Sequence, residues 1–108
     1  MGTLSEKQIN DALPRGWSGS PRGLHAVFAT GSFSAGTSFV DAICEAAESA
    51  NHHPDVLLTY PSVEVFTISH DVDGVTKRDL DLAAAISQIA VDKGFAVDPH
   101  AEARLNAG

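Results

Sequence analysis

The stretch Val56-Leu-Leu-Thr-Tyr-Pro-Ser-Val-Glu-Val-Phe-Thr-Ile-Ser-His70 decides the fold of this 108-residue chain. It holds two β-rich runs, 56–60 and 63–70, and the Pro-Ser pair between them is typical of a hairpin. A further strand is predicted at Leu24–Thr30. Because strands come in adjacent pairs and not singly between helices, we predict an α+β fold. We expect a two-layer sandwich, a four-stranded antiparallel sheet with helices packed on one face.

Helices are predicted on both sides of the hairpin. Apolar residues recur at helical spacing from about residue 35 to 51, and Pro54 ends that helix. Thr76-Lys-Arg-Asp79 is a capping box that opens a second helix, which runs to Lys93 with Gly94 as its C-cap.

The N-terminal segment is expected to form a short helix. Thr3-Leu-Ser-Glu6 is a capping-box pattern, and we expect this helix to run to about Leu13. Phe33 is assigned to a possible strand continuation, ahead of the long helix. Cys44, which falls inside that helix, is predicted to be a small buried hydrophobic residue.

Composition indicates one folded domain over residues 1–108, with a frayed tail from about residue 97. Hydrophobic residues make up 44% and charged residues 19% of the chain, which is ordinary for a globular protein. Seven basic and fourteen acidic residues give a net charge of −7, which disfavours binding to nucleic acid or to an anionic membrane. Without an apolar leader or a membrane-length apolar run, we expect a cytoplasmic protein.

Three of the five histidines fall within one short arrangement. It runs Glu48-Ser-Ala-Asn-His52-His53-Pro54, then continues to His70 and Asp79. Imidazole titrates near neutral pH, so histidines gathered together can both donate and accept protons. The arrangement therefore indicates acid–base chemistry on a small neutral molecule.

Helical geometry gives an expectation for where these side chains point. Glu48 and His52 are four residues apart and should be neighbours. At about 100° per residue, both lie opposite the apolar stripe that begins at Phe39, so neither should be buried. Because His53 precedes a proline, its ring should swing away from His52. A hairpin returning beside the helix could bring His70 close, and we expect the three rings to line one cleft.

The spacing E-x(3)-H-H-P-x(5)-Y-x(9)-H-x(8)-D resembles that of the pterin-4a-carbinolamine dehydratases at every named position. The resemblance covers most of the chain, from roughly Leu4 to Ile89. The family usually has Thr where this chain has Ser69, and a Gly pair where this chain has Asp73-Gly74. Asp73 could narrow the entrance to the site or add negative charge there.

This resemblance implies a dehydratase that expels the C4a hydroxyl of a 4a-hydroxytetrahydropterin as water, without a metal or other cofactor. Carried over by position, His52 and His70 transfer protons and His53 binds and orients the pterin. Glu48 would fix the tautomer of His52. Asp79 would hydrogen-bond the pterin or hold a neighbouring histidine.

The resemblance also implies a homodimer or homotetramer. The run 63–68 is apolar on both faces, which indicates a partner surface on the face that helices do not cover. Two other functions remain open. Three histidines and a carboxylate could form a zinc site, although adjacent histidines diverge in direction. The chain could instead be a protein-binding module, because some family members act as dimerisation partners of a transcription factor.

Overall fold

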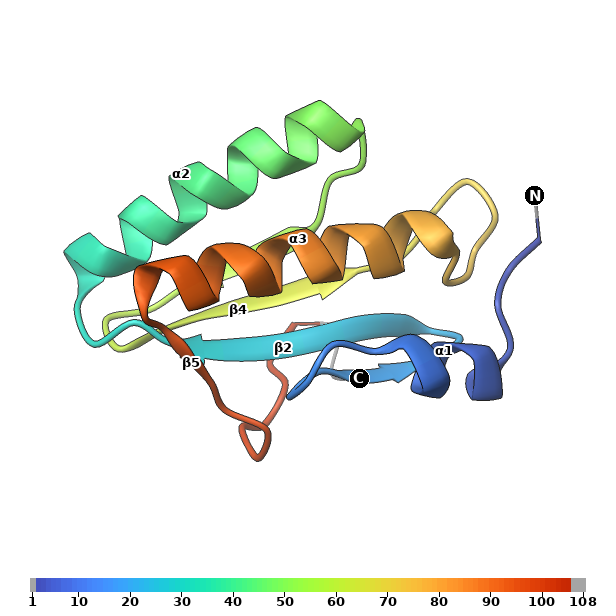
Figure 1. Ribbon diagram of the computed structural model, residues 1–108, viewed down its shortest axis with the longest axis horizontal. Helices are drawn as coiled ribbons and strands as arrows, with labels where there is room; N and C mark the ends of the chain where they lie inside the picture. The colour runs from blue at the N-terminus through green and yellow to red at the C-terminus, as the bar shows by residue number, and fades with distance from the viewer. Residues whose placement is uncertain (1, 106–108) are drawn as a thin grey trace.

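The computed structural model describes residues 2–105. Helices α2 and α3 lie side by side across one face of a five-stranded antiparallel sheet (Figure 1). In chain order the elements are α1 (Glu6–Ala12), β1 (Ser18–Ser20), β2 (Gly23–Ala29), α2 (Phe33–Ala50), β3 (Asp55–Leu58), β4 (Ser62–Thr67), α3 (Lys77–Lys93) and β5 (Ala96–Val97). The sheet order is β1-β2-β4-β3, and β5 adds to β2. The predicted two-layer α+β fold is therefore confirmed, with a short fifth strand added.

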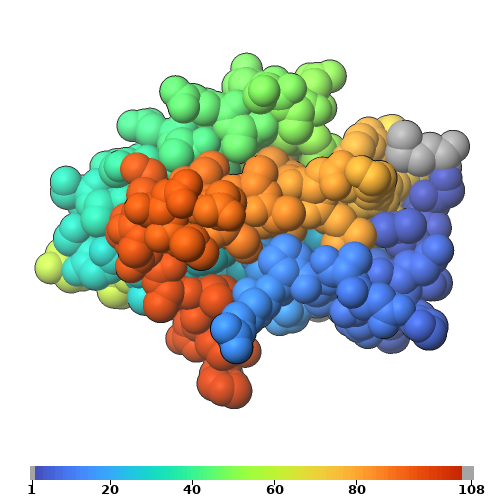
Figure 2. Space-filling model, viewed as in Figure 1, coloured from blue at the N-terminus to red at the C-terminus, as the bar shows by residue number. Residues whose placement is uncertain are grey.

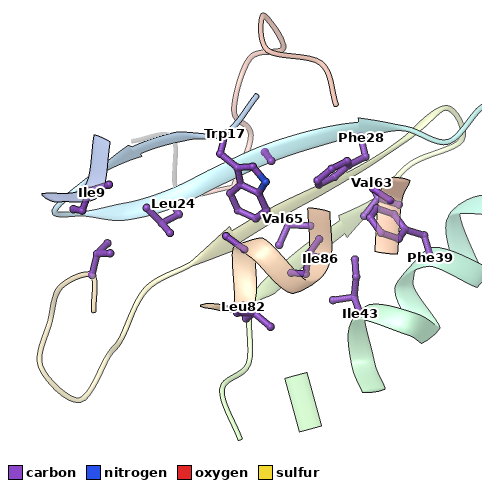
Figure 3. Packing of buried hydrophobic residues seen from close by; sticks show 14 residues of the cluster. Ile9, Trp17, Leu24, Phe28, Phe39, Ile43, Val63, Val65, Leu82 and Ile86 are labelled. Atoms are coloured by element: carbon purple, nitrogen blue, oxygen red, sulfur yellow. The ribbon is translucent and has the colours of Figure 1, made fainter. Parts of the chain in front are cut away.

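The core lies between the sheet and the two long helices (Figure 3). Strands β2 and β4 pair with Phe28 opposite Val63, and both of these side chains are buried in the core. Phe28 packs edge-on against Phe39 of α2, with ring centroids 5.1 Å apart. Burying each such large apolar side chain contributes about 1.5–3 kcal/mol to folding. This core fixes the helices over the sheet and so fixes the site residues at their ends.

Local capping determines where the helices begin and end. Thr76 caps α3 with Asp79 in the predicted capping box, and Gly94 ends it with φ 80°. At α1 the capping box is formed by Ser5 and Gln8, two residues later than predicted. The prediction of a strand continuing through Phe33 was wrong. The Ser32 hydroxyl accepts a hydrogen bond from the Ala35 N–H and caps α2, so Phe33 is the first residue of that helix.

The predicted frayed tail lies against the sheet, through the last described residue. β5 pairs with β2, and the chain then turns back along the face away from α2 and α3 (Figure 1). There the backbone N–H groups of Arg104 and Leu105 donate to the Glu64 carboxylate at 2.7 and 2.6 Å. The tail and the sheet line an open hollow of about 420 Å³. Residues 106–108 of the predicted tail lie outside the described residues.

Glu64 is a charged residue on the face of the sheet that points away from α2 and α3, and the tail buries it. Its carboxylate also contacts His25 of β2 at 3.0 Å. Burial acts to raise the pKa of Glu64, but the hydrogen bonds from Leu105, Arg104 and His25 outweigh it and hold this pKa below its usual value. The carboxylate thus anchors the tail as an ionised acceptor.

Helices α2 and α3 each have an exposed side in addition to the side that packs on the sheet. In Figure 2 the residues of α3 fill the space between α2 and the N-terminal segment. Cys44 is exposed on α2, so the prediction of a buried cysteine was wrong. It follows the buried Ile43 and, together with that residue, lines a hollow beside the end of α2. Within residues 2–105, none of the helices has the length and apolar character needed to cross a membrane.

Candidate active site

His52 is turned inward by the way in which α2 ends. Asn51 adopts a left-handed conformation, with φ 49° and ψ 43°, and reverses the chain. The His52 N–H still bonds to the Ala47 carbonyl at 3.1 Å, as in other left-handed helix ends. His52 is 7% exposed. The prediction that His52 is unburied was wrong, because it extended the helical wheel past the residue at which the helix stops.

Asp79 is the buried partner of His52. The Asp79 side chain is fully buried, and its Oδ1 lies 2.6 Å from His52 Nε2. The Thr67 hydroxyl donates to the same oxygen at 2.6 Å. The Ser69 hydroxyl and the Thr76 N–H donate to Oδ2 at 2.7 and 2.9 Å. Both oxygens of this carboxylate are therefore held by the protein itself.

These donors keep Asp79 ionised. Burial acts to raise the pKa of Asp79, but the hydrogen bonds from Thr67, His52, Thr76 and Ser69 outweigh it and lower this pKa. An ionised carboxylate only accepts hydrogen bonds, so His52 Nε2 must carry the hydrogen between them. Nδ1 is then the ring nitrogen of His52 that is left to exchange a proton with a substrate. The Asp79 carboxylate is thus hydrogen-bonded to a histidine of the candidate set.

Glu48 contacts a different histidine from the one predicted. Its Oε2 bonds to Nε2 of His53, and both side chains are more than half exposed. The expectation that Glu48 is the neighbour of His52 was wrong for the same reason as before, since the reversal at Asn51 places His53 on the outer side of the helix end. His53 lines a hollow of about 180 Å³ together with Cys44, Pro54 and the apolar side chains around them.

His70 lies on the short loop after β4, and it is exposed. The loop is closed at its base by a bridge between Ser69 and Gly74. His70 lines a hollow of about 450 Å³, on the same face as Phe66 and Ile68, as the strand alternation predicts. Asp73 and Arg22 line the same hollow, so Asp73 does lie beside the candidate histidine.

An ion pair ties this loop to α3. Arg78 Nη2 lies 2.7 Å from Asp71 Oδ1. The hydrogen bond from Arg78 is the largest cause that lowers the pKa of Asp71, and the positive charge of Arg78 acts in the same direction. The ion pair therefore joins the residue after His70 to the first turn of α3.

Within residues 2–105, the hollows that contain His53 and His70 are separate. His53 lines one hollow, His70 lines another, and His52 lines neither of these two. The shared cleft expected from the sequence is therefore not formed by these two hollows. The strand β4 explains the separation, because Thr67 and Ser69 point inward to Asp79 while Ile68 and His70 point outward.

Sequence reasoning missed the hydroxyls that surround Asp79 and the arginine beside it. Thr67 and Ser69 continue the inward face of β4, on which Val63 and Val65 belong to the core. Polar residues at two successive inward positions of an apolar strand are a signal of a buried polar partner. Arg78 gave no signal, because its pairing with Asp71 depends on the shape of the loop. Among residues 2–105, no group of three or more His, Cys, Asp or Glu side chains is placed to hold a metal ion.

Comparison with known proteins identifies the chain's family. Residues 2–89 match the model of the family described as pterin 4 alpha carbinolamine dehydratase. A relative from Nostoc punctiforme is 37% identical over 87 residues, which cover 81% of this chain and 94% of the relative. One from Chloroflexus aurantiacus is 36% identical over 91 residues, covering 82% and 98%. Both are named provisionally as pterin-4-alpha-carbinolamine dehydratases. This chain belongs to the pterin 4 alpha carbinolamine dehydratase family.

A solved structure supports the same fold. A transcriptional coactivator/pterin dehydratase from Brucella melitensis superposes with a TM-score of 0.76 at 29% identity. The match covers 82% of this chain and 99% of that one. The family match ends at Ile89, so β5 and the tail on Glu64 lie beyond it.

Proposed function

We propose that this protein eliminates water from a 4a-hydroxytetrahydropterin to give the quinonoid dihydropterin, which a separate reductase can then reduce in tetrahydrobiopterin recycling. In this reaction the C4a–O bond breaks and a C4a=N5 double bond forms. An acid must protonate the leaving hydroxyl, and a base must accept the proton of N5. Histidine suits both tasks near pH 7, and each such transfer typically contributes about 10²–10⁴-fold.

The observation that carries this proposal is the held imidazole of His52. Asp79 fixes its Nε2–H, so Nδ1 presents a single defined nitrogen for proton transfer. We assign the second transfer to His70, which is exposed beside an aromatic side chain, Phe66. We assign His53 to binding and orienting the pterin, with Glu48 holding its ring. Family membership and the exposed positions of His53 and His70 support these assignments.

The hollow at His70 is lined by one positive side chain, Arg22, and one negative side chain, Asp73. An uncharged bicyclic pterin suits this surface, because Asp73 would repel an anionic ligand and Arg22 would repel a cationic one. We propose the cytoplasm as the location of the reaction, with a homodimer or homotetramer as the working form.

The test is direct dehydration by the purified protein. An aromatic amino-acid hydroxylase would generate the 4a-hydroxypterin in the cuvette, and its conversion to the quinonoid product would be followed by ultraviolet absorbance. We expect the rate to rise in proportion to added protein, well above the spontaneous rate. A rate equal to the spontaneous one at micromolar protein would refute the proposal.

A second candidate function is a protein-binding module. The solved neighbour from Brucella melitensis carries coactivator as well as dehydratase in its name, and that observation favours this candidate. A pull-down from native lysate, repeated with a His70→Ala variant, separates the two functions. A binding module keeps its partner after that substitution, whereas a dehydratase without a partner captures nothing in either case.

A further inference from the structure

Ser69 lies at the point where the two sides of the candidate site meet. Its side chain is fully buried and faces Asp79. Its backbone closes the loop that carries His70, because the Ser69 N–H donates to the Gly74 carbonyl at 2.9 Å and the Gly74 N–H donates back at 3.3 Å. A single residue therefore touches both the carboxylate behind His52 and the base of the His70 loop.

The hydrogen of the Ser69 hydroxyl has one possible destination. Ser69 Oγ lies 2.7 Å from Asp79 Oδ2 and 2.9 Å from Thr76 Oγ1. Since the ionised carboxylate cannot donate, Ser69 donates to Asp79. Thr76 must then donate to Ser69, which it is free to do because its own oxygen accepts from N–H groups of Arg78 at 3.2 and 3.3 Å.

The result is a directed chain of hydrogen bonds. It runs from Arg78 to Thr76, on to Ser69 and into Asp79. Arg78 also holds Asp71, the residue after His70. The other carboxylate oxygen, Oδ1, also accepts a hydrogen bond, from the hydroxyl of Thr67. Rotation of the Asp79 carboxylate would break bonds at both oxygens, so Oδ1 stays aimed at His52.

We propose that Ser69 and Thr67 are positioning residues for the dehydration. They act through Asp79, which they orient toward His52, and Ser69 also fixes the loop of His70 relative to that carboxylate. This inference rests on the proposed function for its effect on rate, but the orientation of His52 can be observed without any substrate.

Loss of either hydroxyl changes how Asp79 titrates. The titratable and charged groups around it are the imidazole of His52 from the end of α2, Arg78 from α3 and, through the loop, Asp71. None of these is altered by Ser69→Ala or by Thr67→Val. Removing one hydroxyl donor removes one interaction that favours the ionised carboxylate. The acid limb of the activity profile should then move to higher pH.

The experiment compares Ser69→Ala, which removes the hydroxyl, with Ser69→Thr, which keeps it. Thr67→Val and Thr67→Ser form a second pair, in which valine keeps the shape. We expect Ser69→Ala and Thr67→Val to lower kcat about tenfold with KM little changed, and to raise the acid limb of kcat by about one pH unit. Ser69→Thr and Thr67→Ser should keep kcat and the acid limb close to those of the wild type, because each retains the hydroxyl donor to Asp79.

A second readout does not depend on activity. Nitrogen-15 NMR of the imidazoles reports whether His52 carries its hydrogen on Nε2, and we expect that signature in the wild type and its loss or averaging in the alanine and valine variants. If the wild type shows no dehydration but the NMR change occurs, the proposed function fails and the positioning role stands. If folded Ser69→Ala and Thr67→Val variants keep the wild-type pH profile and His52 signals, the inference is overturned.

Discussion

Replacing Asp79 by asparagine tests the buried carboxylate on which the site is built. The amide has nearly the same shape, so the substitution removes the charge and one acceptor atom without opening a cavity. Thr67 and His52 donate to Oδ1, and Ser69 and the Thr76 N–H donate to Oδ2. An amide nitrogen placed at either position meets two donors and accepts from neither.

The expected loss of stability follows from this count. A hydrogen bond to a charged group contributes about 1.5–3 kcal/mol, and one to a neutral group about 0.5–1.5 kcal/mol. Asp79→Asn weakens four hydrogen bonds that act as one group, and it turns the new amide nitrogen toward two other donors. We therefore expect a loss of about 3–5 kcal/mol, the range found when one partner of a buried pair is removed. In a domain of this size, each kcal/mol lowers Tm by about 4–8 °C.

Urea unfolding at several pH values measures this loss and its pH dependence. Because the pKa of folded Asp79 is lowered, its contribution is fully present above the unfolded value of about 3.9. It is lost as pH falls through the folded value. The stability difference between wild type and Asp79→Asn should therefore be constant near neutral pH and shrink below about pH 4.

Asp81→Asn is the matched control, since Asp81 lies on the same helix, is exposed and pairs with Lys77 on the surface. We expect that variant to lose less than about 1 kcal/mol. If Asp79→Asn were as stable as Asp81→Asn at pH 7, or if its deficit grew toward acid pH, the reasoning about the ionised carboxylate would be refuted.

The remaining predictions concern the exposed histidines and the tail. His70→Ala should lower kcat by about 10²–10⁴-fold in the dehydration assay, with thermal unfolding unchanged because the ring is exposed; an unchanged kcat contradicts its role. His53→Ala should raise KM more than it lowers kcat, as expected of a residue that binds the substrate, and the reverse pattern contradicts that assignment. Glu64→Gln should speed amide hydrogen exchange at Arg104 and Leu105 by at least about tenfold, because a neutral amide oxygen accepts from the two N–H groups more weakly than the ionised carboxylate does. Glu102→Gln, an exposed carboxylate on the same tail, is the control, and equal protection in both variants contradicts the anchoring role of Glu64.

Elements fixed by local signals could be predicted from the sequence. The capping box at Thr76 and Asp79 and the glycine at position 94 set both ends of α3. The hairpin of β3 and β4 followed from two β-rich runs and a Pro-Ser turn. In each case the determining interactions lie within a few residues of one another.

The site was predicted less completely because its contacts depend on chain reversal and on distant residues. The left-handed Asn51 exchanged the environments of His52 and His53, which no helical wheel can show. The partner of His52 is 27 residues away, and the residues that anchor the tail are about 40 residues from Glu64. The identities of the candidate histidines came from their spacing, whereas their burial and partners required the packed structure.

The most direct measurement is a crystal structure with an oxidised pterin bound. We expect the bicyclic ring to contact the side chains of His53 and His70 and to face Nδ1 of His52, while Nε2 remains on Asp79. That result would show ligand binding drawing the separate hollows into one site. A pterin bound away from these three rings, or one that met His52 through Nε2, would contradict the account.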